Sequence, residues 1–174
     1  MDIKTLAQDI HKVAVSKGFW DIPRTIPELV CLVHSELDEA FEAYNNNDFN
    51  GFTEELADVI IRLLDIMEGL DYHIPDSYTI EIVDYGILNL DMEIYYTPLY
   101  NMAWIYKFLL MSHLDLTKCL ELYRGKKDKE ISSYLVQVLF RIWHLGSQIN
   151  LEEAIQRKNE FNKTRPYKHG GKRL

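Results

Sequence analysis

Apolar residues recur every three to four positions along most of the chain, a spacing typical of amphipathic α-helices. A first segment with this spacing ends at Gly18. Thr25 and Glu28 have the spacing of a capping box, and Pro27 is tolerated in a first helical turn. The pattern predicts an all-α helical bundle, with helices over about 25–44, 53–68, 98–113, 115–124, 129–145 and 151–163 and a weaker indication of helix over 78–97.

The hydrophobic pattern also repeats at a fixed offset of 79 residues, which places VHSELDEAFEAYN on SHLDLTKCLELYR without a gap. Any two amphipathic helix pairs match to some extent by chance, but a constant offset through helix, loop and helix favours duplication. His34 and Arg62 recur as His113 and Arg141, which favours structural roles for them. We expect one domain over 1–174, made of a first unit (1–72), a degenerate second unit (80–150) and a closing helix with a basic tail (151–174).

Four acidic residues interrupt the apolar faces of the two helices of the first unit. Glu36 and Glu39 are three positions apart, as are Glu55 and Asp58, so each pair shares one helix face. If these helices pack antiparallel, the carboxylates converge and take up protons unless a cation neutralises them. A hard divalent ion with oxygen ligands, Mg²⁺ before Ca²⁺, suits such a cluster. A single ExxE motif, in contrast, is usually a solvated helix edge.

The second unit lacks most of these acids. The four positions are occupied there by Asp115, Lys118, Tyr134 and Gln137, while the hydrophobic pattern is retained. The acids are therefore not needed to hold the helix pair together, which indicates a function confined to the first unit. A di-iron centre is disfavoured, because such bundles use Glu-x-x-His pairs and no histidine of this chain follows a glutamate at that spacing.

The composition, 47% hydrophobic and 26% charged over 174 residues, is ordinary for a folded cytoplasmic protein. The net charge of −8 argues against a nucleic-acid partner, and the longest apolar stretch, 102–111, is broken by Lys107 and too short for a membrane partner. Cys31 and Cys119 lack metal-ligand spacing and are expected as buried thiols. The last eighteen residues carry seven basic side chains and one acidic one. This composition is typical of either a solvated end or an anion-binding arm.

Two stretches resemble the MazG-like, all-α nucleoside triphosphate pyrophosphohydrolases, whose hallmark is ExxE, a variable loop and then ExxD. The first is GFWDIPRTIPELVCLVHSELDEAFEAY followed by EELADVIIRLLDI, and the second is the ending EEAIQRKNEFNKTRPYKHGGKRL. Together the stretches cover roughly residues 16–68 and 150–173. The acidic motif alone is moderately specific, and its combination with the KxxxNxxRPYxHGG ending makes the resemblance strong.

The resemblance implies a Mg²⁺-dependent enzyme that hydrolyses a (deoxy)nucleoside triphosphate to the monophosphate and pyrophosphate. It assigns Mg²⁺ binding to Glu36, Glu39, Glu55 and Asp58, and triphosphate binding to Lys158, Asn162 and Arg165. Either Glu39 or Glu55 is expected to serve as the base for water. The resemblance places the nucleobase near the loop that holds Trp20, so Trp20 is a candidate for stacking on the base. A tryptophan that covers the end of the bundle is an equally good interpretation.

Members of this family pack their helices into bundles shared between subunits. A two-unit chain could complete its own bundle as a monomer or form a homodimer through the helix expected over 98–113. The alternative to an enzyme is a non-catalytic helical module that senses a nucleotide or binds a partner. The complete set of four acids in the first unit favours the enzyme.

Overall fold

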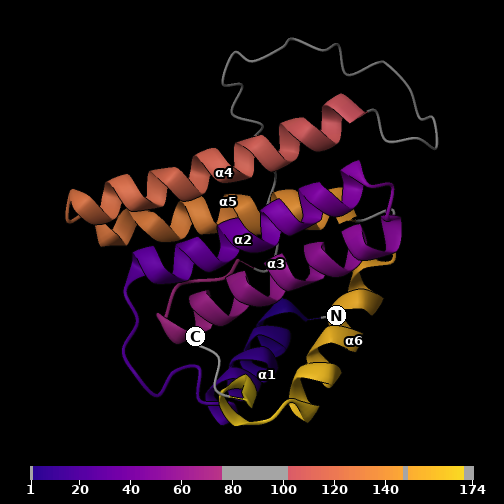
Figure 1. Cartoon of the computed structure of the whole chain (residues 1–174). Coiled ribbons are helices and arrows are strands. Elements are labelled where there is room, and N and C mark those ends of the chain that lie inside the picture. The colour runs from indigo at the N-terminus through magenta and orange to yellow at the C-terminus, as the bar shows by residue number, and fades with distance from the viewer. Residues whose placement is uncertain (1, 76–101, 147–148, 171–174) are drawn as a thin grey trace.

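The computed structural model describes residues 2–75, 102–146 and 149–170 (Figure 1). Six α-helices and a short 3-10 helix account for most of them, which confirms the all-α prediction. The elements are α1 (Ile3–Ser16), α2 (Ile26–Asn45), α3 (Phe49–Gly69), α4 (Met102–Arg124), α5 (Asp128–Gly146), α6 (Leu151–Thr164) and η1 (Tyr167–Gly170). The helix expected over 78–97 lies outside the described residues.

Side-chain caps set the start of the first three helices. The expected capping box at α2 is present: the Glu28 amide donates to the Thr25 hydroxyl, and the Glu28 carboxylate accepts from the Thr25 amide. The prediction that the next helix begins at residue 53 was wrong, because α3 begins at Phe49. Asp48 is its N-cap and accepts from the Gly51 amide at 2.8 Å, so the helix starts within the NNNDFNG segment.

The two helices predicted over 98–113 and 115–124 form a single helix, α4, within the described residues. No glycine or proline interrupts 102–124. Ser112, at the predicted boundary, keeps its helical backbone and donates its hydroxyl to the Phe108 carbonyl at 2.8 Å. The residue after the predicted break, Asp115, is fully buried against Arg141, so tertiary contacts hold this turn inside the bundle.

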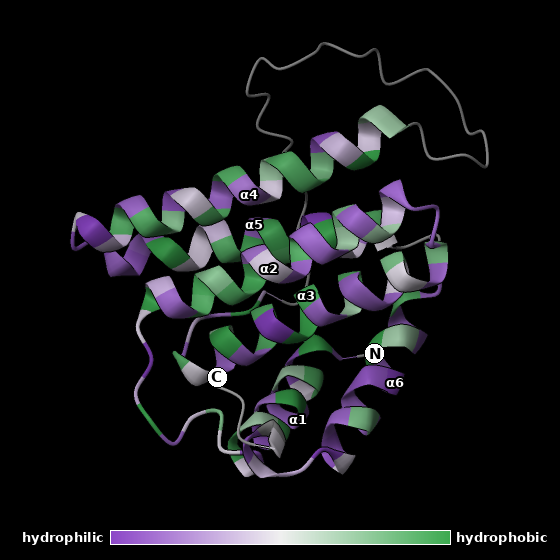
Figure 2. Ribbon diagram, in the orientation of Figure 1, coloured by the Kyte–Doolittle hydropathy of each residue, from purple (hydrophilic) through white to green (hydrophobic). Residues whose placement is uncertain are grey.

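Helices α2, α3, α4 and α5 pack into a four-helix core, with α2 against α3 and α4 against α5 (Figure 1). Helices α1 and α6 both pack on α3, and α6 is mostly hydrophilic (Figure 2). Burial of the apolar stripes drives this packing; the fully buried side chains include Leu37, Leu56, Leu63, Leu116 and Leu135. No helix in the described part of the chain combines the length and apolar character that crossing a bilayer requires.

The two cysteines differ in burial. Cys119 is buried in α4, as expected, and burial raises the pKa of its thiol to about 12. Cys31 is exposed, so the expectation that it is buried was wrong. The reason is its position on α2, whose buried stripe passes on either side of it through Val30 and Val33.

Candidate functional site

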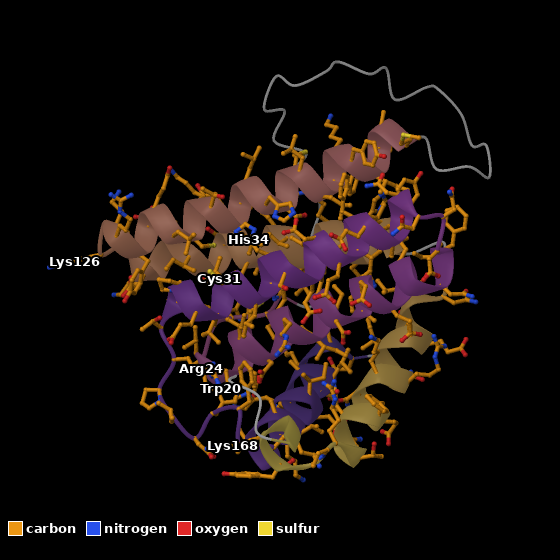
Figure 3. The ribbon with its side chains drawn as sticks, in the orientation of Figure 1. Trp20, Arg24, Cys31, His34, Lys126 and Lys168 are labelled. Carbon is orange, nitrogen blue, oxygen red and sulfur yellow. The ribbon has the colours of Figure 1, made fainter. Side chains whose placement is uncertain are left out.

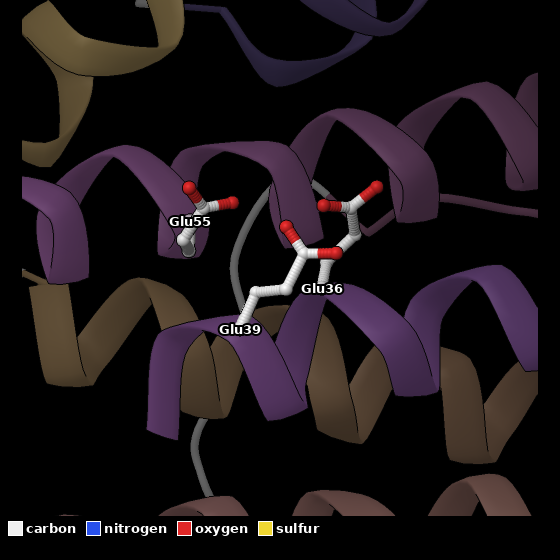
Figure 4. A group of neighbouring side chains, drawn as sticks. All are labelled: Glu36, Glu39 and Glu55. Atoms are coloured by element: carbon white, nitrogen blue, oxygen red, sulfur yellow. The ribbon is translucent and has the colours of Figure 1, made fainter. Parts of the chain in front are cut away.

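The connection between α2 and α3 is short, so these helices lie side by side and their acidic faces meet. Glu36 and Glu39 project from α2 toward Glu55 on α3 (Figure 4). Each of the three glutamates offers a carboxylate oxygen, and these oxygens all lie within 4.8 Å of one another. The convergence expected from the spacing is therefore present for these three acids.

The fourth acid, Asp58, is directed to a cation supplied by α6. Lys158 donates from Nζ to Asp58 Oδ2 at 2.6 Å and lies 3.8 Å from Glu54 Oε2. Glu36 also has a cationic partner, because Arg62 Nε lies 3.1 Å from Glu36 Oε1. Two side chains of this protein thus offset part of the negative charge of the cluster.

Burial and mutual repulsion shift Glu55 and Glu36 toward their protonated forms. The pKa of Glu55 is raised from 4.5 to about 7, chiefly by burial and further by the charges of Asp58, Glu39 and Glu36, against the opposing effect of Lys158. The pKa of Glu36 is also raised, again mainly by burial, although Arg62 opposes it. The positive charge of Lys158 and Arg62 is therefore too small to hold the pKa values of Glu55 and Glu36 in their usual range.

The raised pKa of Glu55 predicts how the metal-free protein responds to pH. Below pH 4.5 the carboxyl group holds its proton in both the folded and the unfolded chain. Between pH 4.5 and about 7 the unfolded chain loses that proton while the folded chain keeps it, so the free energy of unfolding falls as pH rises. Solvent screening of a partly exposed group limits this loss to about 1–2 kcal/mol.

Urea unfolding of metal-free wild type and a Glu55→Gln variant, measured from pH 4 to pH 8.5, checks this expectation. The two proteins should have similar stabilities at the acidic end, and the variant should be the more stable one at the alkaline end. Added Mg²⁺ should reduce this difference by stabilising the wild type. Parallel stability curves for the two proteins would contradict the raised pKa of Glu55 in the folded chain.

A cavity of about 430 Å³ opens over the carboxylates. Helix α6 supplies part of its wall, where Lys158 and Asn162 lie one turn apart and Arg165 follows at the end of the helix. The four predicted acids also line this cavity. Seven of the eight residues predicted for the site, both carboxylates and cations, are therefore brought together around one space.

Trp20, the eighth residue, does not line this cavity. Its indole Nε1 donates to Asp65 Oδ1 at 2.9 Å, and its ring lies so close to Gly69 that a Cβ atom there would be 2.4 Å from the ring. This placement corresponds to the bundle-covering role. The neighbouring Phe19 lines the cavity instead, with the Arg24 guanidinium 4.2 Å from its ring centroid.

Sequence reasoning missed three polar residues of the cavity wall: Lys17, Arg62 and Asp65. Asp65 is 4% exposed, and its Oδ1 also lies 2.7 Å from His11 Nδ1. Burial raises the pKa of Asp65, against the lowering effect of the contacts from His11 and Trp20. One feature of the sequence could have predicted Asp65 as a cavity residue: it lies two turns after Asp58 on the same helix, among apolar residues.

The basic tail folds back on the bundle as far as it is described. Tyr167 donates its hydroxyl to Asp21, and the Lys168 amide donates to the Lys17 carbonyl at 2.9 Å. Gly18 makes this approach possible, because it has a φ of +79° and a Cβ atom there would lie 2.8 Å from the Tyr167 ring. These contacts hold the end of α6 beside the cavity.

The donor set fits a hard divalent cation, because three carboxylates from two helices converge in a space that α6 covers. Two of these carboxyl groups have raised pKa values, as expected of a cluster that a bound cation would neutralise. Comparison of the chain with protein-family models, curated proteins and solved structures found no match.

Proposed function

We propose that this chain is a Mg²⁺-dependent nucleoside triphosphate pyrophosphohydrolase of the MazG-like kind. The observation that carries the proposal is the convergence of Glu36, Glu39 and Glu55 in a cavity that Lys158 and Arg165 also line. Carboxylates alone would repel a triphosphate, and cations alone would bind one without placing the metal ions that phosphoryl transfer uses. The cavity offers both sets.

The three glutamates and Asp58 would hold Mg²⁺. When bound, the metal ion would lower the pKa of the attacking water and offset charge on the pyrophosphate leaving group. Glu55 is our candidate for the general base, because burial raises its pKa to about 7 in the metal-free chain, so this position favours a bound proton more than that of an ordinary carboxylate. Water then forms a bond to the α-phosphorus while the bond to the bridging oxygen breaks, giving the monophosphate, pyrophosphate and one proton.

The cations of α6 would hold the triphosphate. Arg165 can donate two parallel hydrogen bonds to phosphate oxygens, and Asn162 adds an uncharged donor. Lys158 has a second role, since it is bonded to Asp58 in the absence of metal. We infer that Lys158 exchanges Asp58 for a phosphate oxygen when metal and substrate bind.

This exchange predicts opposite effects on binding and turnover for Lys158→Met. Removing the ammonium group frees Asp58 and should tighten Mg²⁺ binding by roughly tenfold in the absence of nucleotide, since a hydrogen bond to a charged group contributes about 1.5 kcal/mol. The same change should slow pyrophosphate release. Isothermal titration with Mg²⁺ measures the first effect.

Lys163→Met is the matched control, because Lys163 lies on the same helix but bonds to Glu160 and Asp9. Its Mg²⁺ affinity should equal that of the wild type. Weaker Mg²⁺ binding in Lys158→Met would contradict the exchange.

We further propose that the chain is a duplicated unit whose second half has lost the metal site. Three buried pairs and one ion pair at the 79-residue offset support this. Leu37 and Leu116 are both fully buried, as are Leu56 with Leu135 and Val59 with Val138. The Glu36–Arg62 ion pair has its counterpart in Asp115–Arg141. In this interpretation, the acid–arginine contact is an inherited structural bond, which the first half also uses at its active site.

Pyrophosphate release from a panel of ribo- and deoxynucleoside triphosphates with Mg²⁺ tests the proposed reaction. We expect pyrophosphate without single phosphate, and one nucleotide preferred over the others. Nucleotide binding without turnover, by folded protein that also binds Mg²⁺, would instead favour the sensing module.

A further inference from the structure

A pair of histidines joins α2 to α4 away from the acidic cluster. His34 lies between these two helices (Figure 3), and its Nδ1 is 2.6 Å from Nδ1 of His113. The ring planes differ by only 11° and the ring centroids are 4.9 Å apart. Because the nitrogen atoms are far closer together than the ring centres, the rings meet edge to edge with their Nδ1 atoms facing each other.

Asp38 favours one position of the proton on His113. Its Oδ1 lies 3.4 Å from His113 Nε2, on the side of the ring away from His34. A nearby carboxylate stabilises a proton on Nε2, and in that tautomer the Nδ1 atom of neutral His113 presents a lone pair to His34. A carboxylate behind a histidine in this way is the usual partner of a metal-binding imidazole.

This pair is separate from the acidic cavity. His34 and Glu36 are two positions apart, and at 3.6 residues per turn their side chains diverge by about 200° around α2. Neither histidine lines the cavity. Solvent reaches the pair, because the side chain of His113 is 26% exposed and that of Asp38 is 73% exposed.

We propose that His34 and His113 bind one divalent transition-metal ion of the Zn²⁺, Ni²⁺ or Cu²⁺ type through their Nδ1 atoms, with Asp38 as a positioning residue. Imidazole nitrogen suits these metals, whereas Mg²⁺ prefers the oxygen ligands of the acidic cluster. In the metal-free chain a single shared proton fills the gap between the nitrogens. The metal ion replaces that proton, and water completes its coordination.

Metal binding requires both histidine rings to move. In tetrahedral coordination, two nitrogens at about 2.0–2.1 Å from one ion lie about 3.3 Å apart, so the Nδ1 atoms separate by roughly 0.7 Å and both rings turn to direct their lone pairs at the ion. The bound ion ties α2 to α4, the helices that carry the first and second units.

The test uses full-length chain without a histidine tag, in a buffer whose millimolar Mg²⁺ occupies the acidic cluster. Titration with Zn²⁺ should show one ion per chain and raise the melting temperature. His34→Ala and His113→Ala should each abolish this binding. Asp38→Asn, which keeps both nitrogen ligands, should weaken it by about tenfold or more. His73→Ala is the control, since His73 is exposed and lies outside the pair.

Zn²⁺ binding that is undiminished in both histidine variants would overturn the proposal. The Cu²⁺ complex of the wild type gives an answer that does not depend on any variant folding. Its electron paramagnetic resonance spectrum should show coupling to two imidazole nitrogens. A spectrum of oxygen ligands alone, or of one nitrogen, would overturn the proposal as well.

Discussion

Glu55→Gln should lower the rate of pyrophosphate release about a thousandfold. The substitution keeps the size of the side chain but removes one of the three carboxylates that lie within 4.8 Å of one another. It also removes the group proposed as the general base, whose pKa burial raises to about 7 in the metal-free chain. A positioned general base by itself contributes about 10² to 10⁴ in rate, and the loss of a metal ligand adds to that.

The measurement is steady-state release of pyrophosphate at saturating nucleotide and Mg²⁺, with circular dichroism to verify the fold. Glu42→Gln is a suitable control, because Glu42 follows Glu39 on α2 and is exposed outside the cavity. Its rate should stay close to that of the wild type. If Glu55→Gln retained a tenth of the wild-type rate or more, Glu55 would not be the base.

Asp115→Ala should have the largest effect on stability, at about 3–5 kcal/mol of unfolding free energy. Asp115 Oδ2 lies 2.7 Å from Arg141 Nη2, and the two side chains are 0% and 7% exposed. Arg141 also donates to the Ser112 hydroxyl at 3.4 Å, a contact too weak to replace a carboxylate. The variant therefore leaves a buried guanidinium without its counter-charge.

Urea unfolding followed by circular dichroism measures this loss. Glu121→Ala removes an acid from the same helix that bonds to Lys118 at 2.7 Å on the surface, and it should cost less than about 1 kcal/mol. An Asp115→Leu/Arg141→Met double variant should regain most of the stability, because an apolar pair carries no desolvation cost. A loss below about 1 kcal/mol in Asp115→Ala would show that Arg141 finds another partner.

Most of the helices could be predicted because the signals for them are local. The spacing of apolar residues and the capping box at Thr25 and Glu28 each involve positions within a few residues of one another. Prediction was wrong at the start of α3 and in the middle of α4. At Asp48 a polar run that is typical of a loop supplies an N-cap. Asp115, next to the predicted break at residue 114, is held inside the bundle by Arg141.

The candidate site was only partly visible in the sequence. The spacing of the acids placed each pair on one face of its helix, and the structure brings Glu36, Glu39 and Glu55 together. The partners of these acids were not visible, because they come from other turns and other helices. Arg62 looked like a structural repeat position until its contact with Glu36 placed it beside the cluster.

The sequence by itself therefore determined the helical class of the protein, the ends of several helices and the sharing of faces by its acidic pairs. These properties follow from backbone hydrogen bonding and helical periodicity, which act over a few residues. Only the tertiary structure decided that Lys158 bonds to Asp58 and that His34 meets His113, contacts that span 100 and 79 positions of the chain. Such contacts depend on how the apolar stripes of α2, α3, α4 and α6 pack. The polar side chains meet their partners only after the helices have come together.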